Sequence, residues 1–229
     1  MPGIEILTEA TENSRVRSLC AYLGSFDPFH RGHAWIVETL LEKFEMVLLL
    51  IPAIHFEKTV HFPLNATFEQ RLKMLASSVL KYRKHNIAAG LAHEVLFIRL
   101  AECLARQFPD AEITFGMGNE TFERFLDSKD YYKRVGLAWT NEEQAKLDEL
   151  KEKIVVFGRS GNNNHFITVP EHVRWISSTL IRETVMELRK TYASEAMWQE
   201  RLEEMISLEV LKFVLQEGLY TPVGNIRRY

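Results

Sequence analysis

Apolar and polar residues alternate in blocks along the chain, and most blocks have the length of one strand or one helix. Continuous apolar runs of strand length occur at Leu19–Leu23, Met46–Ile51 and Ile154–Phe157. Such runs are typical of strands that are buried on both faces. Ile113–Phe115 predicts a shorter strand, which leads into an expected glycine-containing turn at Gly116–Gly118.

Between these runs, apolar residues recur at the spacing of a helix. Thr67–Gln70 matches a capping box and opens one such helix. The apolar side of that helix is expected to consist of Leu72, Leu75, Ala76 and Val79. Helical patterns also run over residues 94–108 and 140–153, and the tail from 193 to 215 predicts one long or broken helix.

Strands that alternate with helices predict the α/β class, with a parallel, doubly wound sheet. Ligands in such sheets bind at the carboxyl ends of the strands. We expect residues 1–17 to form a polar N-terminal extension and residues 18–192 to form the main domain. Residues 193–229 are expected to form a C-terminal helical segment that packs on the same domain.

The composition of the chain limits the kinds of partner that we expect it to bind. The 229 residues carry 28 Lys and Arg against 31 Asp and Glu, and this balance argues against a nucleic-acid surface driven by bulk charge. Two distant cysteines indicate a reduced compartment. The longest apolar run is too short for a bilayer, and no secretory leader is evident. We therefore expect a cytoplasmic protein without membrane or nucleic-acid partners, or a nuclear one if the source is eukaryotic.

The richest stretch is Gly-Ser-Phe-Asp-Pro-Phe-His-Arg-Gly-His at residues 24–33, between the first apolar run and an amphipathic helix. The start of a helix attracts anions through its unpaired N–H groups and its dipole. His30 and His33, three residues apart in the first turn, add two donors on one face. Gly24 and Gly32 let the backbone approach a ligand. Together these features predict a phosphate-binding site.

The two histidines have two other interpretations. Either histidine alone is more typical of a capping or core residue, whereas the pair with its glycines favours a ligand site. His30 and His33 also have a spacing that suits two zinc ligands, but structural zinc needs four, usually with cysteine. Cys20 and Cys103 lie at no ligand-like spacing, so no protein-bound metal is predicted.

A second stretch, Ile176–Arg182, reads Ile-Ser-Ser-Thr-Leu-Ile-Arg. Ser177, Ser178 and Thr179 are residue types whose hydroxyls cap the N–H groups of a helix start. Arg182 lies on the same face as Thr179, and its planar guanidinium suits phosphate oxygens. By itself this pattern also fits an ordinary capped helix with an exposed arginine. Beside the first stretch, it predicts a second phosphate clamp.

The two stretches resemble the H-x-G-H and I-S-S-T-x-I-R signatures of the nucleotidylyltransferase superfamily. That resemblance implies a Rossmann-like fold and the transfer of a nucleotidyl group from ATP or CTP to a phosphate acceptor. Three further segments are similar to the branch of nicotinamide or nicotinic acid mononucleotide adenylyltransferases. They are Thr67–Leu75, Gly118–Tyr132 and Val210–Tyr220. This branch implies ATP and a pyridine mononucleotide as partners, and a dinucleotide and pyrophosphate as products.

The resemblance also implies roles for individual residues. His33, with His30, would donate to the α- and β-phosphates, while Arg182 would hold the β- and γ-phosphates. Magnesium would bridge phosphate oxygens with few protein ligands. The remaining candidates for nucleotide binding are Gly24, Ser25, Phe26, Gly32, Lys58, Gly116, Gly118, Glu120, Arg159, Ile176, Ser177, Ser178 and Thr179.

The sequence departs from the family pattern at Glu120, where the family usually has aspartate. The tryptophan stretch of the bacterial enzymes is also missing, and Tyr131 and Tyr132 occupy that neighbourhood. A pantetheine-phosphate adenylyltransferase, a cytidylyltransferase and a nucleotide-binding ATPase or sensor without transfer activity therefore remain alternatives. The sequence does not decide between nicotinamide and nicotinate as the acceptor base. It also leaves open whether the chain forms a homo-oligomer.

Overall fold

The computed structural model describes residues 3–7, 16–53, 66–82, 84–94, 96–158, 166–191 and 194–221. They form two compact units, and each is described by itself. The sheet unit comprises Met1–Gly24, Val37–Ile54 and Tyr82–Pro170. The helical unit comprises Ser25–Ile36, His55–Lys81 and Glu171–Tyr229. Helix α1 (Arg31–Leu41) begins in the helical unit and ends in the sheet unit.

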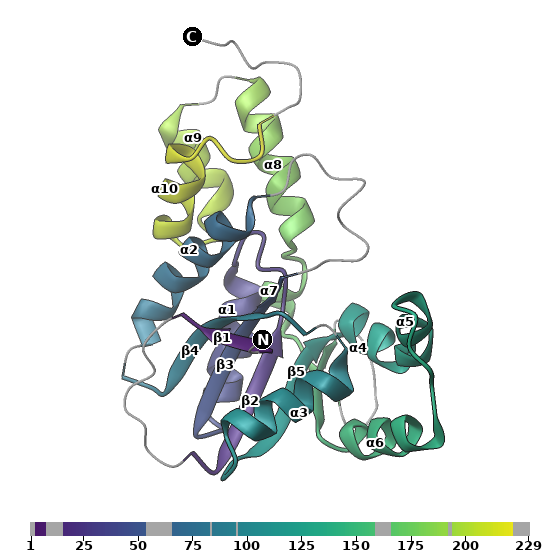
Figure 1. Ribbon diagram of the computed structural model, residues 1–229. Helices are drawn as coiled ribbons and strands as arrows, with labels where there is room; N and C mark the ends of the chain where they lie inside the picture. The colour runs from purple at the N-terminus through teal and green to yellow at the C-terminus, as the bar shows by residue number, and fades with distance from the viewer. Residues whose placement is uncertain are drawn as a thin grey trace. The chain divides into compact units, whose positions relative to one another are not determined.

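The sheet unit contains a seven-stranded sheet in the order β1-β4-β3-β2-β5-β6-β7 (Figure 1). Its strands are β1 (Ile4–Ile6), β2 (Ser18–Leu23), β3 (Met46–Pro52), β4 (Ile87–Ala92), β5 (Glu112–Gly118), β6 (Ile154–Gly158) and β7 (Phe166–Thr168). All neighbouring strands pair in parallel except β1, which is antiparallel to β4. The strand order reverses at β2, whose neighbours β3 and β5 lead to opposite edges of the sheet. This is the predicted Rossmann-like α/β fold, and the prediction is confirmed.

Helices cover both faces of the sheet. One face packs on α3 (Phe97–Gln107), α4 (Asn119–Leu126), α5 (Ser128–Arg134) and α6 (Asn141–Lys151). The buried side chains of Leu19, Ala21 and Leu23 in β2 belong to that core. On the other face, a Cβ atom at Gly116 would lie 3.2 Å from both Cys20 Sγ and Leu40 Cδ1. The absence of a side chain at Gly116 therefore lets α1 pack closely on the sheet.

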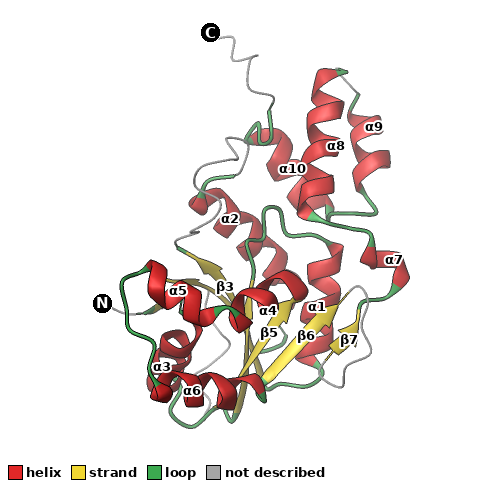
Figure 2. Cartoon of the chain, turned by 90° about the vertical axis from the view of Figure 1, so that its right-hand side faces the viewer, coloured by secondary structure: helices red, strands yellow, loops and turns green. Residues whose placement is uncertain are grey.

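The helical unit consists of α2 (Phe68–Val79), α7 (Glu171–Arg174), α8 (Ser178–Lys190), α9 (Glu195–Leu202) and α10 (Leu208–Gln216). Helix α10 packs on α2 and α9, and α8 packs on α9 (Figure 2). A short 3-10 helix, Leu80–Tyr82, follows α2. The predicted capping box at Thr67 and Gln70 is present, with both reciprocal hydrogen bonds.

Several local predictions were wrong. The expected turn at Gly116–Gly118 is the last part of β5, because glycine serves packing there rather than a turn. Helix α3 begins at Phe97 rather than at residue 94. Strand β4 was not anticipated.

Strand β1 lies in the segment that the sequence assigned to an N-terminal extension before the first strand. It pairs with β4, and Ile4 is buried. The tail predicted as one long or broken helix is broken, because Ser207 caps a new helix start by accepting from Val210 N. The domain boundaries predicted at residues 17 and 192 stay predictions.

The pairing of β1 with β4 yields a stability prediction. A Cβ atom at Gly90 would lie 2.6 Å from the backbone oxygen of Glu5, whereas one at Gly118 would meet nothing closer than Phe157 O at 3.9 Å. We expect Gly90→Ala to lower the free energy of unfolding by about 1 to 3 kcal/mol. Gly118→Ala, the matched control, should change it by less than about 0.5 kcal/mol. Equal effects in urea denaturation would contradict this packing.

Candidate functional site

The histidines of the first motif lie where β2 leads into α1. His30 immediately precedes the helix, and its carbonyl accepts the first helical hydrogen bond from Ala34 N at 3.0 Å. His33 lies in the first turn of α1. Their rings stack, with centroids 3.7 Å apart and planes inclined by 25°. The two histidines are therefore brought together as expected, although His30 lies just outside the helix.

Backbone contacts determine which ring nitrogen carries the proton. His30 Nδ1 accepts from Gly32 N at 3.1 Å and from His33 N at 3.4 Å. His33 Nδ1 accepts from His30 N at 3.3 Å. A neutral imidazole that accepts at Nδ1 carries its hydrogen on Nε2. Both rings are thus oriented as Nε2–H donors.

An aromatic cluster surrounds His33. Phe26 meets the imidazole edge-on at 5.1 Å, and Phe29 lies at 5.6 Å from it, measured between ring centroids. Both phenylalanines are buried. Burial lowers the pKa of His33 from 6.5 to about 3, so the ring is neutral at pH 7. His33 can therefore donate a hydrogen bond to an anion without carrying a charge.

Phe26 itself has a φ of 46°, in the left-handed region that bulky residues rarely adopt. Its ring is 1% exposed and also contacts Phe29, with a centroid separation of 5.9 Å. Burial of the ring offsets the backbone strain, which is of the order of 1 kcal/mol or more. The strained residue lies four positions before His30, inside the turn that carries the site.

The second motif contacts the first. Ser178 Oγ donates to Pro28 O at 3.2 Å, and Arg182 Nη1 donates to Asp27 O at 2.7 Å. Arg182 Nη2 also donates to Thr179 Oγ1 at 3.1 Å. The guanidinium and the start of α8 are therefore attached to the turn that precedes His30. The two motifs, about 150 residues apart in sequence, form one site.

Only one of the three predicted capping hydroxyls caps the helix. Ser177 accepts from Leu180 N at 3.1 Å and is the N-cap of α8. Ser178 binds the turn instead, and Thr179 accepts from Arg182. The expectation that all three hydroxyls satisfy helix N–H groups was wrong, because two of them have polar partners in the turn and in the helix itself. Ile176, next to the cap, is buried.

The other candidates lie elsewhere in the chain. Gly24 N donates to Leu50 O at 3.1 Å, and Gly118 is the N-cap of α4. Gly116 lies within β5, and Glu120 lies in the first turn of α4. All four belong to the sheet unit, at or near the carboxyl ends of its strands. Lys58 and Arg159 fall outside the described residues, and their roles stay predictions.

Sequence reasoning missed several residues of the helical unit. Asp27 is buried and accepts from Tyr220 Oη at 2.7 Å. Arg71 Nη1 donates to Ser25 O at 3.3 Å, which makes Ser25 part of an arginine-bound turn. Asp27 lies within the first motif, while Arg71 and Tyr220 lie in the two helical segments that supported the resemblance. The resemblance of those segments to the family was the signal available in the sequence. It did not show which residues Arg71 and Tyr220 contact.

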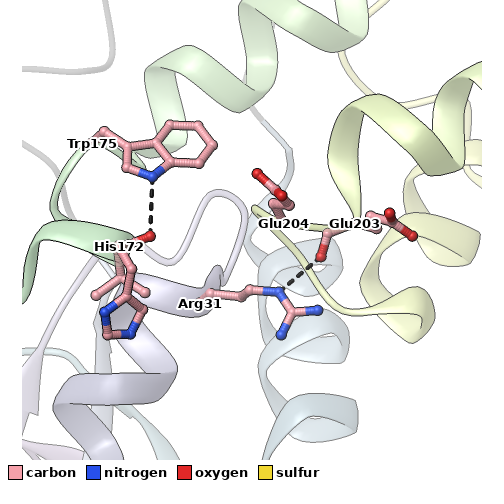
Figure 3. A pocket seen from close by; sticks show the side chains of 6 residues that line it. Arg31, His172, Trp175, Glu203 and Glu204 are labelled. Atoms are coloured by element: carbon pink, nitrogen blue, oxygen red, sulfur yellow. Dashed lines mark hydrogen bonds between the residues drawn. The ribbon is translucent and has the colours of Figure 1, made fainter.

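A pocket of about 580 Å³ opens beside the first motif (Figure 3). It is lined by Arg31, His172, Val173, Trp175, Glu203 and Glu204. Arg31 Nε donates to Glu203 O, and Trp175 Nε1 donates to His172 O. The Trp175 indole lies on one side of the pocket and the two glutamates on the other. Trp175 is 43% exposed.

Within the described ranges, no group of three or more His, Cys, Asp or Glu side chains could hold a metal ion. Among the helices that the structure describes, none is long and apolar enough to span a membrane.

A mostly parallel sheet in this order defines a Rossmann-like α/β protein. The family model described as cytidylyltransferase-like matches residues 21–184, and the chain belongs to this family. The superfamily resemblance read from the two motifs is thereby confirmed.

Individual relatives extend the comparison. The chain is 28% identical over 193 residues to a probable nicotinate-nucleotide adenylyltransferase of Dictyoglomus turgidum, covering 80% of this chain and 89% of the relative. It is 22% identical over 207 residues to one of Cytophaga hutchinsonii, covering 87% and 96%. The structure of Plasmodium falciparum nicotinic acid mononucleotide adenylyltransferase complexed with NaAD is similar, with a TM-score of 0.65 and 15% identity. That match covers 89% of this chain and 97% of the other.

The burial of His33 predicts a pH dependence of stability. The unfolded chain takes up a proton near pH 6.5, whereas the folded protein does so only near pH 3. Stability is therefore fully present above pH 6.5 and decreases as the pH falls from there towards 3. We expect the wild type to lose about 1 to 2 kcal/mol more than His33→Asn between pH 7 and pH 5, by denaturant unfolding. Identical losses would show that His33 is not held neutral.

Proposed function

We propose that this chain transfers the adenylyl group of ATP to the 5′-phosphate of nicotinic acid mononucleotide, forming the dinucleotide and pyrophosphate. The observation that carries the proposal is the contact between the two motifs. Neutral N–H donors of His30 and His33 and the guanidinium of Arg182 are attached to one turn. The names of the curated relatives support nicotinate rather than nicotinamide as the acceptor base.

The chemistry needs positioning more than proton transfer. The phosphate of the acceptor is already ionised at pH 7, so its attack on the α-phosphorus requires no general base. Negative charge grows on the oxygens of the α-phosphate and of the leaving pyrophosphate. Fixed donors directed at those oxygens lower the barrier because they need no reorganisation during the reaction. His33 fits this role because its tautomer is fixed by His30 N.

Arg182 is proposed to bind the β- and γ-phosphates. A guanidinium has five N–H donors, and among the described residues two hydrogen bonds attach it to Asp27 O and Thr179 Oγ1. The other N–H donors of the guanidinium are left to bind phosphate oxygens. The start of α8 can bind such oxygens too. Gly24, Gly118 and Glu120 are proposed to contact the rest of the nucleotide, with Glu120 in place of the usual aspartate.

A magnesium ion is proposed to accompany the triphosphate. Because the described residues offer no set of three metal ligands, an ion bound here would take its ligands from phosphate oxygens and water, as this hard cation prefers. When bound, it would neutralise part of the phosphate charge. The two free cysteines support a cytoplasmic location.

Replacing His33 tests the proposed role directly. We expect His33→Ala to reduce adenylyl transfer by about 100- to 1,000-fold, which is typical for the loss of one fixed donor to a developing charge. The control is His93→Ala, because His93 is an exposed residue whose side chain lies against Glu5 in the sheet unit. Both variants should keep the far-ultraviolet circular dichroism of the wild type. Near wild-type turnover of His33→Ala would remove His33 from the mechanism.

The acceptor is tested by incubating the protein with magnesium and either ATP or CTP, together with each candidate acceptor. Dinucleotide and pyrophosphate are measured together, and we expect both with nicotinic acid mononucleotide in equal amounts. Dinucleotide formed only from nicotinamide mononucleotide would correct the acceptor. Products formed only with phosphopantetheine or with CTP would favour one of the alternative transferases. ATP consumption without any transfer product would favour an ATPase.

A further inference from the structure

The turn that carries the proposed phosphate donors contains a buried carboxylate, that of Asp27. Asp27 is 4% exposed, and its Oδ1 accepts from Tyr220 Oη at 2.7 Å and from Ala66 N at 3.2 Å. The carbonyl of the same residue accepts from Arg182 Nη1. Asp27 therefore joins the chain after α10, the start of α2 and the arginine of α8 to one point of the turn.

Tyr220 is held firmly where it meets this carboxylate. The residue is 3% exposed and has a left-handed φ of 58°. The preceding Gly218 is also left-handed and ends α10 by donating to Leu215 O. Arg189 of α8 donates to Leu219 O at 3.1 Å and to Val214 O at 3.1 Å. The phenol is thus a fixed donor from a rigid support.

The ionisable groups around Asp27 favour the hydrogen bond that its carboxylate accepts from Tyr220. Burial, and after it the nearby Asp27 carboxylate, raises the pKa of Tyr220, so the phenol stays protonated and donates. Arg71 and Arg182 bind the carbonyls of Ser25 and Asp27 on either side of Phe26. Two guanidiniums and one phenol therefore determine the path of the strained turn ahead of the histidines.

We propose that Tyr220 is a positioning residue for the transfer reaction, acting through Asp27 on the turn that carries His30 and His33. This proposal rests on the proposed function, because its kinetic assay measures adenylyl transfer. Removing the phenolic oxygen leaves the buried carboxylate with one donor fewer, and the turn relaxes around it. A displacement of about 1 Å at a catalytic donor is enough to reduce a rate by as much as 100-fold.

The chain offers a matched control. Tyr82 is also buried, and its hydroxyl also donates to a carboxylate oxygen, Glu38 Oε1, at 2.7 Å. That pair belongs to the sheet unit and has no contact with the turn among those described. Tyr82→Phe and Tyr220→Phe therefore remove the same chemical interaction, one outside and one inside the proposed site.

The first experiment compares kcat and KM of the two variants at a temperature where both are folded. We expect Tyr220→Phe to lower kcat by about 10- to 100-fold with a smaller change in KM. Tyr82→Phe should stay within about twofold of the wild type, although both lose stability. Equal activity of the two variants would overturn the proposal and leave Tyr220 a stabilising residue only.

A double-mutant cycle tests whether the effect passes through Asp27. Asp27→Ala removes the acceptor of Tyr220 Oη together with the charge. If Tyr220 acts through Asp27, Tyr220→Phe should reduce kcat much less in the Asp27→Ala background than in the wild type. Reductions that multiply independently would overturn the route through Asp27.

Nitrogen-15 spectra of the histidine rings separate this proposal from the proposed function. We expect both rings of the wild type to be Nε2–H tautomers, and Tyr220→Phe to shift the His33 ring signals while Tyr82→Phe leaves them unchanged. This measurement needs no substrate. If the wild type forms no dinucleotide but the shift occurs, the proposed function fails while the positioning of His33 by Tyr220 stands. Unchanged His33 signals in Tyr220→Phe would overturn that role.

Discussion

The site depends on the hydrogen bond from Arg182 to the carbonyl of Asp27. This bond attaches the start of α8 to the turn before α1, and Ser178 adds a second attachment at Pro28. Two helix starts thereby meet at one turn. At the start of α1 the N–H groups of Arg31, Gly32 and His33 already have acceptors within the protein. Both helix starts still present a positive dipole end, which favours the same kind of ligand, a polyanion. Every proposed role of the histidines follows from this meeting.

Burial gives the site its chemical character. An exposed histidine pair would be partly charged near pH 6.5 and would change its charge when a phosphate bound. The phenylalanines around His33 keep its pKa near 3, so the ring donates from a neutral state that does not change across the physiological range. In the proposed function, fixed neutral donors and the permanent cation of Arg182 would stabilise the developing phosphate charge without proton exchange.

The sequence predicted the elements whose signal is local. Strands β2, β3 and β6 are continuous apolar runs, and the capping box of α2 is a four-residue pattern. Strand β4 was missed because Ile87–Ala92 is mostly alanine and glycine, and its place between β1 and β3 decides its structure. Gly116 was assigned to a turn because sequence does not show that α1 packs against it.

The features of the site also divide into those that the sequence predicted and those that it did not. The motifs showed where His30, His33 and Arg182 lie and which ligand they suit, because their chemistry is local. The hydrogen bond between Asp27 and Tyr220 joins residues 193 positions apart, and no periodicity records such a pair. Ser177 caps α8 while Ser178 binds the turn, and this difference also depends on the turn that Ser178 contacts.

A crystal structure with a non-hydrolysable ATP analogue and magnesium tests the central claim most directly. We expect His33 Nε2 and the Arg182 guanidinium both to lie within hydrogen-bonding distance of one triphosphate chain. A triphosphate bound away from the start of α1, or one that contacts only one of these two groups, would contradict it.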